Sequence, residues 1–190
     1  MYDWVKGRPS LLLRTQDLEV WPGGATVQGE PVLGAPKLEP EPRSFVGMTD
    51  FEGSLVLAVF TEALTTAVPL ELGGLMLVSA SYCDDDASVA DHLDLVPIAG
   101  WQILARRFVS VGEDYVLFDG GQKGLDMTDP RKEEEILATS GGAIPVQIPP
   151  GTYEVETLGP WRPDERTELY LTRIVRESPS GMTPLGPLLG

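Results

Sequence analysis

Short apolar runs separated by Gly and Pro dominate the pattern of the chain. SLLLR at 10–14 predicts a short strand. The run SLVLAVF at 54–60 is apolar at odd and even positions alike, which predicts a central strand covered on both faces. GLMLVSASY at 74–82 predicts a second strand of this kind, entered through a turn at Gly73 and Gly74.

The second half of the chain has the pattern of a series of strands. GTYEVETL alternates, with Tyr153 and Val155 on one face and Glu154 and Glu156 on the other. We therefore expect a half-exposed antiparallel strand with one solvated face. The predicted strands of this half span 101–111, 114–119, 143–149, 151–158 and 167–175.

One helix is predicted, over 85–95. An Asp among residues 84–86 suits a helix N-terminus, because its carboxylate caps free N–H groups and favours the helix dipole. Apolar side chains then recur at i, i+4 and i+7, and Pro97 ends the pattern. These apolar positions are Val89, Leu93 and Val96.

Composition adds a fold class to this pattern. The 190 residues include 17 Pro and 21 Gly, which favour turns over long helices. We expect a strand-rich α+β fold with a mainly antiparallel sheet, one or two short helices and long Pro/Gly-rich loops. The predicted organisation is a single domain over 1–176, with a Pro-rich loop or arm at 22–43, followed by a Pro/Gly-rich C-terminal tail over 177–190.

Two segments and the cellular compartment complete this picture. Residues 17–21 fit either a helical turn or a strand, and 129–139 fit either a short helix or a charged loop. A single Cys excludes an internal disulfide, and the N-terminal residues lack the apolar core of a signal peptide. We expect a cytoplasmic protein.

The charge balance restricts the partners. There are 14 basic and 29 acidic residues, giving a formal net charge of −15. Such a field repels phosphates and anionic lipids, so we expect neither nucleic-acid nor membrane binding. It attracts basic proteins, and a basic protein partner is therefore predicted. The oligomeric state stays open.

Candidate chemistry concentrates in SYCDDDASVADHLD at 81–94, which holds the only Cys and the only His of the chain. On a helix, Asp85, Ser88 and His92 lie along one stripe, which makes a small hydrolase an alternative. A helix face supplies neither oxyanion donors nor a group that orients the imidazole, so we expect no catalytic residues and no enzyme activity.

Metal and cofactor sites are not expected either. Three consecutive Asp point in different directions, unlike the alternating ligands of a calcium loop. One Cys and one His cannot complete a zinc site. The Gly-rich segment 118–126 contains Lys123 but lacks the spacing of a phosphate-binding loop. The remaining candidate is an acidic partner-binding surface, formed by Asp84, Asp85, Asp86, Asp91, Asp94, Glu133, Glu134 and Glu135.

Several short motifs follow one another along the chain in a characteristic order. They are Trp4-Val5, Gly7, Pro9 to Leu13, Trp21 to Gly24, Phe45-Val46-Gly47, Leu55-Val56-Leu57, Thr65-Thr66, Gly74 to Val78, Asp84 to Asp86, Tyr115 to Asp119 and Pro149 to Val155. This order resembles the immunity protein 21 family of bacterial polymorphic-toxin systems. The Pro-rich segment at 22–43 and Ser79-Ala80, where that family usually has a basic-aromatic pair, depart from its pattern.

This resemblance implies a non-enzymatic protein that binds and neutralises a toxin made by the same cell. A nuclease toxin carries a basic cleft, which an acidic surface can occupy as a decoy while speeding association. A second alternative is a structural or assembly protein of a phage or secretion particle, with the arm at 22–43 as its contact.

Overall fold

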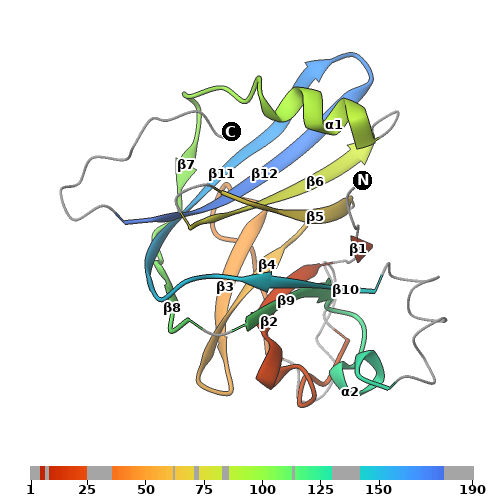
Figure 1. Ribbon diagram of the computed structural model, residues 1–190, viewed down its shortest axis with the longest axis vertical. Helices are drawn as coiled ribbons and strands as arrows, with labels where there is room; N and C mark the ends of the chain where they lie inside the picture. Colours follow the sequence, from red (N-terminus) through yellow and green to blue (C-terminus); the bar gives the residue numbers. More distant parts are fainter. Residues whose placement is uncertain are drawn as a thin grey trace.

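The computed structural model describes residues 5–6, 9–24, 36–61, 63–70, 73–82, 86–112, 114–129 and 142–177, the side chains of 6, 82, 86–88 and 90 excepted. It contains two antiparallel sheets packed face to face (Figure 1). The strands are β1 Val5–Lys6, β2 Ser10–Arg14, β3 Val46–Phe51, β4 Ser54–Val59, β5 Leu64–Pro69, β6 Leu75–Tyr82, β7 Gln102–Ile103, β8 Phe108–Ser110, β9 Asp114–Asp119, β10 Ala143–Gln147, β11 Gly151–Asp164 and β12 Thr167–Arg176.

The two sheets divide these strands unequally. The larger sheet has the order β1-β5-β6-β12-β11-β7, with β8 also paired to β11. The smaller sheet has the order β10-β9-β2-β4-β3. Two short helices accompany them among the described residues, α1 at Asp86–Leu93 and α2 at Gly124–Met127. The expectation of a strand-rich, mainly antiparallel fold with one or two short helices is thereby confirmed.

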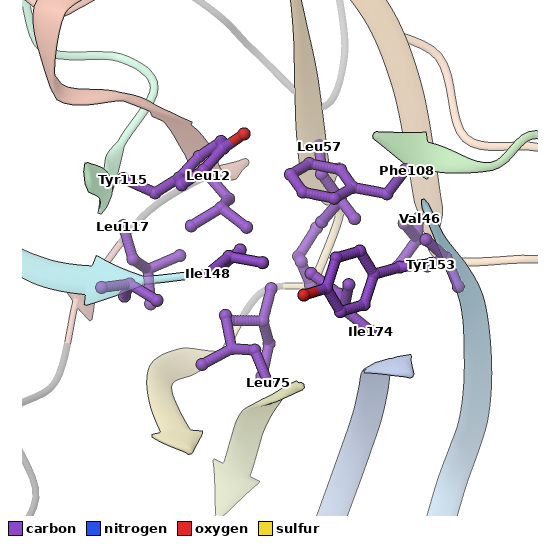
Figure 2. Close-up of a cluster of buried hydrophobic side chains, with 14 of the residues drawn as sticks. Leu12, Val46, Leu57, Leu75, Phe108, Tyr115, Leu117, Ile148, Tyr153 and Ile174 are labelled. Carbon is purple, nitrogen blue, oxygen red and sulfur yellow. The ribbon is translucent and has the colours of Figure 1, made fainter. Parts of the chain in front are cut away.

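Three apolar clusters hold the layers together. The central cluster lies between the sheets and draws on both, with Leu12 and Leu57 from the smaller sheet and Leu75 and Ile174 from the larger (Figure 2). A second cluster, around Trp21, covers the outer face of the smaller sheet. A third lies between the larger sheet and α1, which crosses over that sheet in Figure 1. Both outer faces of the pair of sheets are thus covered by apolar side chains.

This layering explains the continuous apolar runs in the sequence. Along β2, Leu12 enters the central cluster whereas Leu11 and Leu13 enter the cluster around Trp21. In β4, Leu57 and Val56 divide in the same way. Side chains alternate across a strand, so a strand that is covered on both faces needs apolar residues at every position. The strands predicted at 10–14, 54–60 and 74–82 are confirmed.

The predicted single strand over 101–111 is wrong. It consists of β7 and β8, separated by residues 104–107, which we term the closing loop. The Leu104 side chain enters the central cluster and its N–H donates to the carbonyl of Val155 at 2.8 Å. The Arg106 side chain turns instead toward β3. The strand is interrupted there because Leu104 bonds to the larger sheet whereas Arg106 bonds to the smaller one.

The solvated face predicted for 151–158 is also wrong at Glu156. This side chain is buried, with 3% of its surface exposed, and it accepts a hydrogen bond from Arg173 on β12. The guanidinium of Arg173 lies 4.0 Å from the ring centre of Trp101, which adds a cation–π contact. A charge at this depth is tolerated because it is paired and hydrogen-bonded. The alternating pattern showed only the charge and gave no sign of the partner.

Several elements were not predicted. In β5, the buried Thr65 replaces the expected apolar signal and bonds Ser79 and Ser10 through hydroxyl groups, at 2.9 and 3.2 Å. Helix α2 begins in the Gly-rich segment 118–126, where no helix was predicted. A Cβ at Gly124 would lie 1.4 Å from the carbonyl oxygen of Leu18, so only Gly allows this close approach. β1 and β3 were likewise missed.

The remaining expectations have mixed outcomes. Residues 17–21 form neither strand nor regular helix, since the short 3-10 helix η1, Thr15–Asp17, precedes a turn. Asp17 anchors it by accepting from Arg14 at 2.7 Å and from Ser54. Residues 25–35 of the Pro-rich segment 22–43 lie outside the described residues, as do 130–139 of the charged segment and the tail from 178 onward.

Candidate functional site

Helix α1 places the acidic residues that the structure describes. Val89 and Leu93 are fully buried against the larger sheet, where they contact a cluster that includes Met76, Val78 and Leu171. The helix therefore turns its opposite side to solvent. Asp91 and Asp94, the second just beyond the helix, are exposed.

The other predicted partner-binding residues are placed only in part. Asp86 begins α1, but its side chain lies outside the described atoms. Asp84 and Asp85 lie outside the described residues, as do Glu133, Glu134 and Glu135. The structure thus brings together two of the eight predicted carboxylates as side chains, Asp91 and Asp94.

The imidazole of His92 contacts a residue that the sequence did not single out. Its Nε2 lies 2.9 Å from Oδ2 of Asp164, at the end of β11. The hydrogen bond from the Arg166 N–H is the main cause of a lowered pKa of Asp164, and the Thr167 hydroxyl and His92 act in the same direction against partial burial. His92 therefore connects α1 to the turn between β11 and β12.

This contact bears on the Ser-His-Asp hypothesis. Nδ1 of His92 is buried and makes no hydrogen bond within the described part of the chain. Asp85 and the side chain of Ser88 lie outside what is described, so no contact of theirs supports or opposes that alternative. His92 and Asp164 are 72 positions apart in the sequence, so no local pattern predicts their contact.

The exposed carboxylates near this contact form one surface. Asp164 and Glu165 occupy the β11–β12 turn, and both are exposed. His92 joins this turn to α1. The carboxylates of the turn therefore lie at the same end of the helix as Asp91 and Asp94. We term Asp91, Asp94, Asp164 and Glu165 the α1 acidic surface. A nearby cation, Arg162, is already paired with Glu168.

A second feature is a groove at the mouth between the two sheets. It has a volume of about 540 Å³ and runs between the β5–β6 turn and the segment 145–149 of β10 and its loop. Its lining residues are Ala67, Pro69, Leu70, Gly73, Gly74, Leu75, Gly112, Asp114, Pro145, Val146, Gln147, Ile148 and Pro149.

The base of this groove continues into the central core. Leu75 and Ile148 are lining residues and members of the central cluster, which Figure 2 shows together with Tyr153. The Tyr153 hydroxyl lies 3.2 Å from the carbonyl oxygen of Gly73 and 2.8 Å from that of Pro149. These two carbonyls belong to opposite walls. One hydroxyl thus ties the two walls together.

Other site classes receive little support from the described residues. Among them, no group of three or more His, Cys, Asp or Glu side chains is arranged to hold a metal ion. None of the helices in the described ranges is long and apolar enough to cross a membrane. Comparison of the chain with protein-family models, with curated proteins and with solved structures finds no match.

Proposed function

We propose that this chain is a non-enzymatic binding protein that neutralises a basic partner through the α1 acidic surface. The observation that carries the proposal is the exposure of Asp91 and Asp94 beside Asp164, whose carboxylate is held in place by His92. In this proposal the partner is a cognate toxin of the same cell, which is what the resemblance to the immunity protein 21 family implies.

The physical basis is electrostatic. A net charge of −15 draws a basic protein toward the chain from a distance. The acidic surface on α1 then gives the encounter a direction, because complementary patches bias the approach. A toxin that binds phosphates would be blocked by carboxylates that occupy the same cleft, without any chemical step on either protein.

The test is capture of the partner by wild-type protein and by a double variant, Asp91→Asn with Asp94→Asn, at about 50 mM and about 300 mM salt. We expect a basic protein to be captured at low salt, and the variant to bind it about threefold to tenfold more weakly. Purified partner should lose its toxic activity on binding.

A matched control carries the same change in charge elsewhere. Glu19 and Glu52 are exposed and lie in turns next to strands of the smaller sheet. The variant Glu19→Gln with Glu52→Gln should therefore leave capture unchanged. If both double variants captured the partner equally weakly, net charge and not the α1 acidic surface would explain the loss. Undiminished capture by the α1 variant would overturn the proposal.

A further inference from the structure

The groove between the β5–β6 turn and β10 has the features of a second binding site. Its volume of about 540 Å³ falls within the range of about 300–1,000 Å³ that is typical of ligand sites. Its base is apolar, and Tyr153 fixes the separation of its walls through the carbonyls of Gly73 and Pro149. The site is therefore shaped before any ligand arrives.

The shape of the groove favours an extended chain. Five consecutive residues, 145–149, line one wall. Of these, 145–147 belong to β10, which lies at the edge of the smaller sheet and, among the described strands, pairs with β9 alone. Edge strands recruit extended peptides because their backbone groups lack partners on the open side.

The polar groups of the groove favour a cationic ligand. Among the described residues that line the groove, Asp114 is the one charged side chain, and none of them is Lys or Arg. Pro69, Pro145 and Pro149 have no N–H, so their backbone offers carbonyl acceptors alone. The Gln147 amide reaches Asp114 at 3.4 Å, a long contact that leaves the carboxylate able to accept further hydrogen bonds.

We infer that this groove binds an extended basic segment of a protein partner. A Lys side chain can lay its aliphatic stem along the accessible Leu70 and Pro145 and direct its ammonium to Asp114. The backbone of the segment lies beside β10 and donates to its carbonyls. The inference rests on the proposed function only in taking the basic partner as the source of the segment. The groove and the α1 acidic surface are separate sites.

The test uses a defined probe, the capped peptide Lys-Val-Lys-Val-Lys, titrated into isotope-labelled protein while backbone amide signals are followed by NMR. We expect saturable shifts at Gly73, Gly112 and Val146, and no such shifts with the peptide Glu-Val-Glu-Val-Glu. Shifts confined to α1, or no saturable shifts, would overturn the inference. If n-butylamine reproduces the shifts at the same concentration, the site binds amines and not peptide chains.

Two variants sharpen this test. Gln147→Arg introduces a cation beside Asp114 in the exposed rim, and we expect it to weaken peptide binding by about tenfold. Asp114→Asn should weaken binding about threefold, because an exposed ion pair contributes little. The matched control is Gln102→Arg, since Gln102 is also exposed but lies on β7 at the far edge of the larger sheet. Equal binding by the variants Gln147→Arg and Gln102→Arg would exclude the groove.

The same titration separates this inference from the proposed function. The variant with Asp91→Asn and Asp94→Asn should bind the peptide with unchanged shifts in the groove, even where it fails to capture the toxin. Loss of peptide binding in that variant would place the cationic contact on α1 and overturn the groove as its site.

Discussion

The two sides of the sheet pair differ, because a loop closes one of them and a groove remains at the other. On one side, the closing loop of the larger sheet reaches β3 of the smaller one. Arg106 lies 2.6 Å from Asp50 and 3.5 Å from the carbonyl of Met48, and the N–H of Ala105 donates to Glu41 at 3.1 Å. On the other side, β10 and the β5–β6 turn remain apart and leave the groove.

This difference shows how a sheet pair can be sealed or left accessible. The closed side inserts an apolar side chain, Leu104, between the sheets and adds polar contacts outside it. The open side also contributes apolar side chains, Leu75 and Ile148, to the central cluster, but there the hydroxyl of Tyr153 bridges walls that stay apart. Burial of apolar surface contributes more free energy than an exposed ion pair, so Leu104 should dominate the closed side.

The largest effect is expected from removing the Leu104 side chain. Leu104→Ala leaves a cavity between the sheets, and we expect the free energy of unfolding in urea to fall by about 3 kcal/mol. Ile103→Ala is the matched control, because the neighbouring Ile103 side chain is 57% exposed and should tolerate truncation. Equal losses in the two variants would show that Leu104 does not dominate the closed side.

A smaller effect is expected on the open side. Tyr153→Phe keeps the buried ring but removes the hydroxyl that bridges Gly73 and Pro149. The free energy of unfolding should fall by about 1 kcal/mol. Hydrogen exchange should also accelerate at the β5–β6 turn and not at the closing loop. Faster exchange on both sides would contradict a local role for the hydroxyl.

The same hydroxyl gives the open side a pH dependence. Burial raises the pKa of Tyr153 above its ordinary value of 10.0, the neighbouring Tyr115 adds to this, and Arg176 opposes it. The unfolded chain then ionises first, so the contribution to stability is present below pH 10.0 and is lost as the pH rises through the folded pKa. The loss in unfolding free energy from about pH 9 to about pH 11 should be smaller in Tyr153→Phe.

The alkaline loss of unfolding free energy should not vanish in Tyr153→Phe, because Tyr170 contributes to it as well. Its pKa is also raised, chiefly by burial and then by Glu168. A variant that lacks both hydroxyls, Tyr153→Phe with Tyr170→Phe, should therefore be less sensitive to alkaline pH than either single variant.

The smallest effect belongs to the ion pair of the closed side. Asp50 and Arg106 have side chains that are 71% and 41% exposed, so Arg106→Gln should cost about 0.5 kcal/mol at low salt. This difference should shrink as salt is added, because exposed charges are screened. Lys37→Gln, which breaks the more exposed pair with Glu39, serves as the control. If Arg106→Gln lowered the free energy of unfolding more than Tyr153→Phe does, this ion pair would contribute more than the hydroxyl, contrary to our expectation.

The sequence predicted the strands whose burial is visible in their own residues. β2, β4, β6 and β9 contain runs of consecutive apolar residues, and such runs predict strands that are covered on both faces. β5 escaped because its inward Thr65 is satisfied by hydroxyl partners from other strands. The assignment of strands to two sheets also escaped, since pairing depends on contacts between distant segments that no local pattern encodes.

The candidate site divides in a similar way. Asp91 and Asp94, predicted as part of an acidic partner-binding surface, are exposed in the structure. Their role in binding stays a prediction. Asp164 could not be found from sequence, because its contact with His92 depends on α1 lying over the hairpin of β11 and β12. The burial of Glu156 likewise depends on Arg173 and Trp101.

The position of β12 has a consequence for synthesis of the chain. It follows every other described strand in the sequence, yet it lies inside the larger sheet and pairs with both β6 and β11. Until Thr167–Arg176 has left the ribosome, those two strands each expose an unpaired edge and part of their apolar surface. The growing chain therefore exposes these apolar edges until β12 emerges, and chaperone binding should be concentrated in that interval.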